Sequence, residues 1–382
     1  MKILSYLRRE NNGLAFALMD RGHDLWVFPD DVMLMQRKIG FPAQPLEGAD
    51  PTPCPSGLAG LVESHVQERW GQTSSIVGAV KALHAKEGLD AVLVWTDAGI
   101  LQRAMVLAAK HLGIPTFEIT HGALNTYRQG HFECESHVDY VLAPGQEEKD
   151  FRAFYNAKCD VLITGKPSFD WMFSGSMLAA RSAVRGKLDI PDRRPIILYG
   201  MTWRHPFSTW ERDLDRGEST VMEAHMNMQP VCKPFTIIKP HYVQASDKGV
   251  REIAAWCEAN GITDYAVTGM DIQALLPAVD MVVSHKSSLL VEAVLMDKPA
   301  VGFDFRARND FDFYRGLGIE WVSEPRDLMN AMTRCLLDRD TRDRLAVERE
   351  RGKVYFNHIC DGRATGRVVD AIEQVVAGTL AA

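Results

Sequence analysis

Short apolar runs alternate with longer amphipathic stretches along the whole 382-residue chain, and this alternation constrains the fold more than any other feature of the sequence. Several runs are apolar at consecutive positions, which is typical of strands that are covered on both faces of a parallel sheet. Strand, helix and strand in series predict βαβ units. In the first half we expect strands at 2–7, 24–28, 90–95, 115–120, 138–143 and 159–164.

The second half repeats this pattern and ends in a predicted helix at 364–377. Its strands are expected at 195–200, 235–241, 265–269, 280–285, 299–304 and 319–323. A break at Gly165-Lys166-Pro167 follows a predicted strand, so we divide the chain into domains 1–166 and 167–360 and a closing segment, 361–382. The expected fold class is α/β, with two Rossmann-like doubly wound domains facing across a cleft. Ligands are expected at the carboxyl ends of the strands.

Charge and cysteine content narrow the classes of partner. The chain has 43 Lys and Arg against 50 Asp and Glu, so it lacks the global basic field that non-specific nucleic-acid binding requires, although a local basic groove would still be compatible with it. No run approaches the ~20 apolar residues of a spanning helix, and peripheral membrane contact stays open. Seven dispersed cysteines favour reduced thiols and a cytoplasmic location. We expect no transmembrane segment, no metal and no cofactor.

His121 and Gly122 follow the predicted strand at 115–120 and form the first candidate catalytic pair. A histidine at this strand end could act as general base on an acceptor hydroxyl, because its unperturbed pKa is about 6.5. Gly122 would let the backbone turn sharply toward a ligand. The alternative is a strand-end histidine that only hydrogen-bonds a carbonyl, and the pattern alone gives the two interpretations similar weight.

The second candidate is the run at 280–288, in which Ser284 and His285 end a predicted strand and Ser287 and Ser288 begin a helix. Serine hydroxyls and backbone N–H groups at a helix N-terminus form an anion site. Glu292 lies about one turn further on, where a carboxylate could hold ribose hydroxyls. The alternative is an ordinary serine N-cap with a surface glutamate.

Cations and hydroxyls follow two further strands. Thr202 and Arg204 come after the strand at 195–200, and Lys239 and His241 close the strand from 235. At the carboxyl edge of one parallel sheet they would lie near the serine pair and neutralise a diphosphate. Singly, each is better explained as an ordinary surface or capping residue, but together they favour a phosphate site.

Other signals are weaker. Gly-x-Gly-x-x-Gly after the first strand and the P-loop are both absent, which disfavours dehydrogenases and NTPases. Asp310-Phe311-Asp312 resembles a metal-binding Asp-x-Asp, but its charged surroundings favour a solvated turn. The proline-rich stretch 41–57 is either a flap on the acceptor side or a surface excursion.

As an ordered set, these motifs resemble a known group. The two-domain pattern and the closing helix resemble the GT-B glycosyltransferase fold, in which such a helix crosses back to the N-terminal domain. The motifs are most similar to those of the CDP-glycerol glycerophosphotransferases of teichoic-acid and capsule synthesis. They are His121-Gly122, 196–204, Lys239-Pro240-His241, 280–288, Asp297-Lys298-Pro299 and 360–364.

This resemblance implies His121 as the base and Glu292 near the ribose of the donor. It also implies phosphate contacts from Lys239, His241, Ser287 and Ser288. The chain departs from the family pattern at His285-Lys286, where an Asp and an aromatic residue are usual, at Tyr242, where Pro is usual, and at Glu292, where Asp is usual.

The sequence therefore predicts a metal-independent transferase that takes a sugar or glycerol phosphate from a CDP- or UDP-linked donor to an acceptor hydroxyl of unknown identity. A second resemblance is to the UDP-N-acetylglucosamine 2-epimerases, carried by Trp95-Thr96-Asp97, Gly113-Ile114-Pro115 and 163–167. His121 stands where that family has a carboxylate, which favours transfer over epimerisation. A non-catalytic nucleotide-sugar binding protein is the third alternative.

Overall fold

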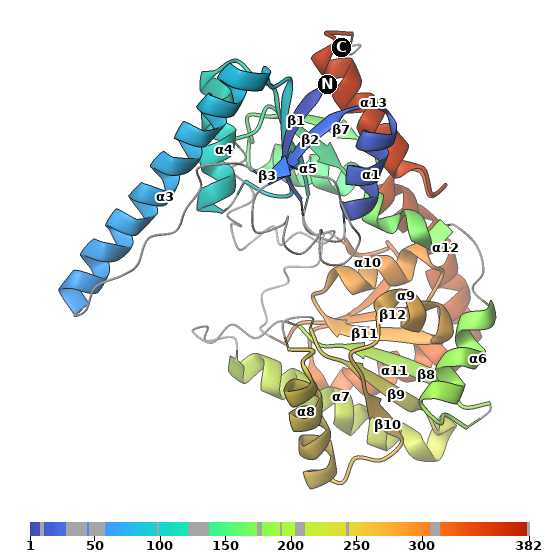
Figure 1. Cartoon of the computed structure of the whole chain (residues 1–382). Coiled ribbons are helices and arrows are strands. Elements are labelled where there is room, and N and C mark those ends of the chain that lie inside the picture. Colours follow the sequence, from blue (N-terminus) through green and yellow to red (C-terminus); the bar gives the residue numbers. More distant parts are fainter. Residues whose placement is uncertain are drawn as a thin grey trace. The chain divides into compact units, whose positions relative to one another are not determined.

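The computed structural model describes residues 1–7, 11–27, 44–45, 58–97, 99–120, 137–173, 178–191, 193–202, 211–241, 244–305 and 314–379. The chain divides into two compact units. Unit 1 combines Met1–Asp170 with Asp361–Ala382, and unit 2 is Trp171–Cys360. Each unit is built on one parallel sheet with helices packed against it (Figure 1).

Unit 1 contains a seven-stranded sheet with the order β3-β2-β1-β4-β5-β6-β7, in which every neighbouring pair is parallel. Its strands are β1 (Lys2–Tyr6), β2 (Asp24–Val27), β3 (Gln44–Pro45), β4 (Ala91–Val94), β5 (Thr116–Ile119), β6 (Tyr140–Ala143) and β7 (Asp160–Ile163). Its helices are α1 (Asn12–Asp20), α3 (Leu58–Glu87), α4 (Ile100–His111), α5 (Gln146–Phe154) and α13 (Ala364–Val376). Strand β4 is buried at every position, as its consecutive apolar residues predict, and β5 is equally buried although it contains Glu118.

Helix α13 comes from the end of the chain and packs against α1 in unit 1 (Figure 1). Val368 and Ile372 join the core that Ile3 and Leu14 form. No side chain within α13's own segment caps its first turn. Asp170 does so instead, because its carboxylate accepts hydrogen bonds from the N–H groups of Ala364 (2.9 Å) and Thr365 (2.8 Å).

Unit 2 contains a six-stranded parallel sheet with the order β10-β9-β8-β11-β12-β13. Its strands are β8 (Ile196–Gly200), β9 (Phe235–Lys239), β10 (Tyr265–Val267), β11 (Met281–His285), β12 (Ala300–Phe303) and β13 (Ile319–Val322). Its α-helices are α6 (Leu178–Lys187), α7 (Glu211–Cys232), α8 (Asp247–Ala259), α9 (Ile272–Leu275), α10 (Ser288–Leu295), α11 (Leu328–Leu337) and α12 (Arg339–Asn357). Short 3₁₀ turns lie at η3 (Pro167–Phe173), η4 (Leu276–Ala278) and η6 (Pro325–Asp327).

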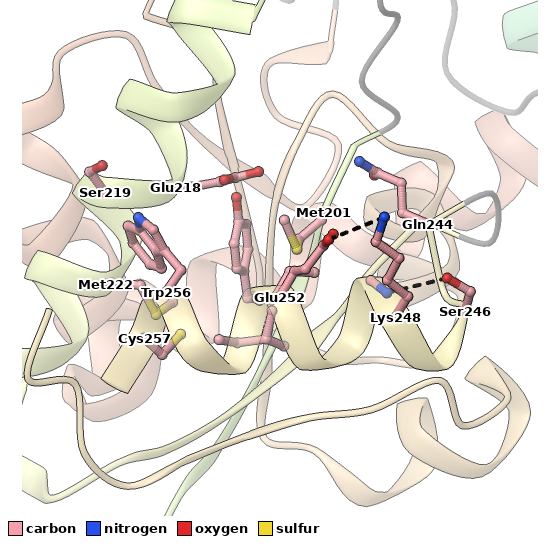
Figure 2. A pocket seen from close by; sticks show the side chains of 14 residues that line it. Met201, Glu218, Ser219, Met222, Gln244, Ser246, Lys248, Glu252, Trp256 and Cys257 are labelled. Atoms are coloured by element: carbon pink, nitrogen blue, oxygen red, sulfur yellow. Dashed lines mark hydrogen bonds and ion pairs between the residues drawn. The ribbon is translucent and has the colours of Figure 1, made fainter. Parts of the chain in front are cut away.

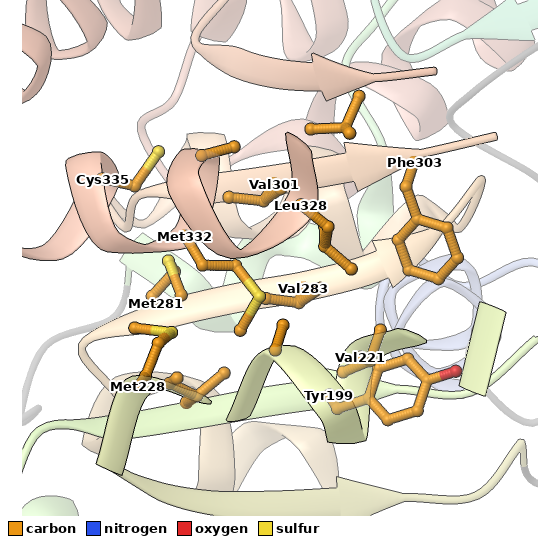
Figure 3. Packing of buried hydrophobic residues seen from close by; sticks show 14 of the residues in the cluster. Tyr199, Val221, Met228, Met281, Val283, Val301, Phe303, Leu328, Met332 and Cys335 are labelled. Atoms are coloured by element: carbon orange, nitrogen blue, oxygen red, sulfur yellow. The ribbon is translucent and has the colours of Figure 1, made fainter. Parts of the chain in front are cut away.

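The main core of unit 2 lies between β8, β11 and β12 on one side and α7 and α11 on the other (Figure 3). Met228, Met281 and Met332 meet in it, together with Leu328 and Phe303, all at most 1% exposed. Unbranched methionine side chains fill irregular gaps between helices and a twisted sheet. This packing holds β8 and β11, the two central strands, in fixed register.

Both sheets are doubly wound, which confirms the predicted α/β fold class. In unit 2 the chain runs outward from β8 through β9 to β10, then returns to the other side of β8 as β11 and runs outward again to β13. The direction therefore reverses between β8 and β11. In open α/β sheets, ligands bind beyond the carboxyl ends of the strands at such a reversal.

Candidate functional site

The candidate site of unit 2 lies at the carboxyl ends of β8 and β11. These strands are adjacent, with Ser284 paired to Gly200 in register. Thr202 follows β8, Lys239 and His241 close β9, and α10 begins directly after β11. The structure thus brings the described residues of the predicted phosphate site to the carboxyl ends of neighbouring strands in one sheet.

Two hydroxyls tie the ends of β8 and β11 together. The Ser284 hydroxyl lies within 2.6 Å of the Gly200 carbonyl oxygen and 2.9 Å of the His285 carbonyl oxygen. The Thr202 hydroxyl donates to the same His285 oxygen at 3.1 Å. Because Ser284 has no exposed surface, we replace its predicted direct contact with a donor by a positioning role. Thr202 is half-buried and also stabilises this boundary.

His285 is 5% exposed, and its position is fixed by its neighbours. Its Nε2 lies 3.5 Å from an oxygen of Asp304, the residue after β12, and its ring packs beside Phe303 with centroids 5.6 Å apart. A largely buried imidazole beside a carboxylate can present only an edge to a ligand. A donor contact for His285 stays a prediction.

Ser287 is the N-cap of α10, and its hydroxyl oxygen accepts from the Leu289 N–H at 3.3 Å. The capping interpretation of this serine is therefore correct, but it leaves the hydroxyl proton available for donation. Ser287 and Ser288 are both half-buried, and the first turn of α10 contains no acidic residue. Such a helix end favours an anion through its N–H groups and dipole.

Gly200 lets α10 approach β8. A Cβ built at Gly200 would lie 2.4 Å from Leu289 Cδ2, far inside van der Waals contact. A larger residue at this position would require the Leu289 side chain to move. The glycine therefore lets a leucine of the first turn of α10 pack close to the end of β8.

Lys239 and Glu292 form the charged part of the site. Burial lowers the pKa of the half-buried Lys239 ammonium, while the carboxylates of Asp271 and Glu292 oppose this change. Lys239 ends β9 and Glu292 lies on α10, so this electrostatic interaction joins two predicted donor residues from different elements. Asp271 follows β10 at the same edge. Asp271 was not among the residues predicted from the sequence, although it too follows the carboxyl end of a strand.

Three of the predicted site residues, His121, Gly122 and Arg204, lie outside the described residues, as do Asp310-Phe311-Asp312 and most of 41–57. The strand that leads to His121 is described. In it, Glu118 of β5 pairs with Arg152 of α5 at 3.0 Å, and Arg152 also binds Glu148 at 2.6 Å. The three side chains are at most 5% exposed. This buried triad anchors the strand that ends one residue before Thr120.

The comparison with protein families decides the classification. A family described as CDP-glycerol:poly(glycerophosphate) glycerophosphotransferase matches residues 100–374, more than two thirds of the chain. The chain belongs to this transferase family. The match spans the described parts of the candidate site and the strand before His121, and it confirms the resemblance found in the sequence.

A curated relative supports the same family. Teichoic acid poly(glycerol phosphate) polymerase from Bacillus subtilis (strain 168) is 23% identical over 225 residues, which are 56% of this chain and 28% of that protein. The chain therefore spans less than a third of the length of this relative.

Solved structures share the GT-B fold of this glycerophosphotransferase-family chain. The wall teichoic acid polymerase TagF has a TM-score of 0.57 at 13% identity, covering 100% of this chain and 90% of that one. The UDP-GlcNAc 2-epimerase from Neisseria meningitidis, bound to UDP-GlcNAc, has a TM-score of 0.63 at 14% identity, covering 98% of this chain and 100% of that one. At these identities the likeness establishes the fold alone. Within the described ranges, no helix is both long and apolar enough to span a membrane.

Proposed function

We propose that this protein transfers glycerol phosphate, or a sugar, from a CDP- or UDP-linked donor to an acceptor hydroxyl without a metal ion. Membership of the glycerophosphotransferase family supports the reaction class. The observation that carries the proposal is the position of Lys239, Glu292 and the Ser287–Ser288 N-terminus of α10 at the β8–β11 reversal. We propose that unit 2 binds the donor and that unit 1 contributes the acceptor side.

The proposed donor contacts follow from charge and donor geometry. The N-terminus of α10, with the Ser287 and Ser288 hydroxyls, would hold phosphate oxygens, and Lys239 would neutralise them. Arg204 and His241 are proposed as further phosphate contacts, and His285 as an edge contact. Glu292 would accept hydrogen bonds from the ribose hydroxyls. Lys239, Arg204 and the N-terminus of α10 supply the positive charge that a leaving phosphate needs, which is why no metal enters the proposal.

The proposed reaction is an in-line displacement. His121 removes the proton of the acceptor hydroxyl as its oxygen attacks, and Gly122 lets the chain turn at that point. With a CDP-glycerol donor, the new bond joins the acceptor oxygen to the glycerol-bearing phosphorus, the bridging P–O bond breaks, and CMP leaves. With a sugar donor, attack occurs at the anomeric carbon and the whole nucleoside diphosphate leaves. In both cases negative charge develops beside α10 and Lys239.

Donor binding and transfer can be tested separately. CDP-glycerol should bind the wild type by calorimetry, and the double substitution Ser287→Ala, Ser288→Ala should weaken binding about tenfold or more. Ser246→Ala is the matched control, because Ser246 caps α8 in the same way, with its Oγ 3.2 Å from the Gly249 nitrogen. Equal affinity of the double variant and the wild type would contradict the donor site.

His121→Ala should keep donor affinity and lose transfer to an acceptor in chelator-treated buffer. Wild-type transfer by His121→Ala would contradict the base, and transfer that requires an added divalent cation would contradict metal independence.

Epimerisation is the second candidate, because the fold is shared with a 2-epimerase bound to UDP-GlcNAc. An epimerase needs no acceptor. Formation of UDP-N-acetylmannosamine from UDP-N-acetylglucosamine alone would favour this function over transfer.

A further inference from the structure

Unit 2 contains a cavity of about 710 Å³ between α7 and α8, over the part of the sheet formed by β8 and β9 (Figure 2). Its volume is in the range of pockets that hold drug-sized molecules. The cavity is separate from the proposed phosphate site, because neither Lys239, Glu292 nor the Ser287–Ser288 pair lines it.

The cavity is elongated along α8. One face of this helix forms a wall, because its lining residues recur every three or four positions, as in Ser246, Gly249, Ile253 and Trp256. From Ser246 to Cys257, which also lines the cavity, the helix rises by about 16 Å. Figure 2 shows Ser246 at one end of this wall and Trp256 near the other. Such a cavity fits an extended ligand better than a compact one.

The floor of the cavity is apolar, and its residues are each no more than 7% exposed: Tyr199, Met201, Met222, Ile238 and Cys257. On α8, Ile253 is half-buried and Trp256 is 38% exposed. Methionine side chains are unbranched and flexible, so they can adapt to a chain that lies on them. An aliphatic chain bound here would remove apolar area from water on both surfaces.

The charged groups that line the cavity have partners within the chain. Lys248 lies 3.7 Å from Glu252, and both side chains are more than half exposed. Glu218 of α7 also interacts within the chain. A charged ligand group would lose water here without gaining an unpaired charge in return, which costs free energy. The lining therefore favours a neutral ligand.

One end of the cavity offers hydrogen bonds. Ser246 caps α8, and its Oγ accepts from the Gly249 N–H at 3.2 Å, which leaves the hydroxyl proton available for donation. The Gln244 side chain lies at the same end (Figure 2), and its Oε1 accepts no hydrogen bond from the described residues. A ligand hydroxyl both donates and accepts, so it could pair with both residues.

We propose that this cavity binds a neutral single-chain amphiphile, such as a long-chain alcohol. Its hydroxyl would pair with Gln244 and Ser246, and its chain would lie on the apolar floor with the tip toward Trp256. A length of about 16 Å accommodates an extended chain of about ten to twelve carbon atoms. This site goes beyond the proposed transfer reaction, in which the donor phosphates bind elsewhere.

A series of primary alcohols tests the length of the site on the intact chain. Calorimetric titration should show the affinity rising about threefold or more for each methylene added between hexanol and decanol, because each one buries more apolar surface. The rise should stop near dodecanol, where the chain fills the cavity. An affinity that does not depend on chain length, or that keeps rising at the same rate beyond dodecanol, would overturn the proposal.

Decanol, decylammonium and decanoate test the charge preference, because they differ mainly in their head groups. Decanol should bind at least about fivefold more tightly than either ion. It should leave the affinity for CDP-glycerol unchanged, which separates this test from that of the donor site. An affinity for decylammonium or decanoate equal to that for decanol would refute a neutral ligand.

Two further measurements locate the chain. An alcohol with bromine at its tip, 11-bromoundecanol, should quench tryptophan fluorescence in the wild type, and Trp256→Phe should lose most of this quenching. Ile253→Gln should weaken decanol binding about tenfold, because it places an amide in the apolar wall. Val250→Gln is the matched control, since Val250 is a half-buried residue of the same helix that does not line the cavity. Equal losses of affinity in the two glutamine variants, or unchanged quenching in Trp256→Phe, would place the chain elsewhere and refute the assignment.

Discussion

At the carboxyl ends of β8 and β11, a few single residues hold the two strand ends in place. Gly200 provides space for Leu289, and the hydroxyls of Ser284 and Thr202 bind the carbonyl oxygens that end the strands. The Met201 N–H donates to the Lys239 carbonyl oxygen at 3.0 Å, which adds β9 to the same arrangement. These residues hold the backbone at the ends of the three strands, and the predicted donor contact of Thr202 stays a prediction.

Gly200→Ala should destabilise the protein by about 1–3 kcal/mol, because its methyl group would overlap the buried Leu289 side chain, which would have to move and repack against the first turn of α10. Donor affinity should fall with it. Gly186→Ala is the control, because Gly186 is an exposed helical residue whose added Cβ would meet nothing within 4 Å. Denaturant unfolding and CDP titration measure both effects. Unchanged stability and CDP affinity in Gly200→Ala would show that α10 does not need this space.

Lys239 should give donor binding an alkaline limit. Burial lowers the pKa of its ammonium, so the charge is lost at lower pH than in an ordinary lysine. CDP affinity should fall as pH rises through this lowered pKa, and Lys239→Arg should bind CDP without that fall because arginine stays charged. Calorimetry between neutral and alkaline pH makes the comparison, and parallel pH profiles would refute the assignment.

His225 should make unit 2 sensitive to acid. Its side chain is fully buried, with Nε2 2.7 Å from the Thr263 carbonyl oxygen and Nδ1 2.9 Å from the Thr236 hydroxyl. Burial lowers its pKa, so the unfolded chain binds a proton first as pH falls below about 6.5. The free energy of unfolding should decline below that pH. His225→Gln should be less stable at neutral pH but decline less steeply; equal slopes in chemical denaturation would contradict this account.

At the scale of elements, the N-termini of α10 and α13 both have backbone N–H groups that need partners, and the fold supplies those partners in two different ways. The N-terminus of α10 has a local serine cap and no acidic residue in its first turn. The N-terminus of α13 is capped by Asp170, almost two hundred residues earlier in the chain. The first arrangement leaves binding capacity for a ligand, whereas the second uses it to attach a terminal helix.

Asp170→Ala should loosen α13. The substitution removes three hydrogen bonds, to the N–H groups of Ala364 and Thr365 and to the Thr365 hydroxyl at 2.7 Å. We expect a loss of about 1–2 kcal/mol and faster hydrogen exchange across 364–376. Asp338→Ala removes the comparable cap of α12 and serves as the control. It should leave exchange in α13 unchanged; equal acceleration in both variants would argue against a specific role for Asp170.

At the scale of the whole molecule, each unit has its own core and its own sheet. The proposed donor site draws its described residues from unit 2 alone. The buried Glu118–Arg152–Glu148 triad belongs to unit 1. Substitutions in the two units should therefore have separable effects.

Arg152→Met tests this separation. It leaves two buried carboxylates without their shared cation and should cost about 3–5 kcal/mol of stability, while CDP affinity is retained at temperatures where the variant is folded. Arg339→Met, which removes an exposed pair with Asp343, should cost less than about 1 kcal/mol. A large loss of CDP affinity in folded Arg152→Met would show that the units are not energetically separate.

The sequence predicted the strands well because both faces of each sheet are covered, so the strands appear as continuous apolar runs. It missed β3, whose two residues lie in a proline-rich stretch, and the helices α6 and α7. In α7, Gly217 and Pro230 interrupt the helical pattern.

At the site, the expectation that ligands bind at the carboxyl ends of strands singled out Lys239, which ends β9, and the predicted helix start at Ser287 and Ser288 singled out Glu292, which lies in α10. The sequence could not distinguish the buried Ser284, because a serine in a strand gives no sign of which side chains cover it.

The cap that Asp170 places on α13 has a consequence for biosynthesis. Unit 1 is made from the first and the last segments of the chain, whereas unit 2 is one uninterrupted segment between them. Because domains fold as units, unit 2 can fold without the last segment of the chain, whereas unit 1 needs that segment to complete its core. A chain that ends at residue 360 and has been released from the ribosome should therefore resist proteolysis in unit 2, and not in unit 1.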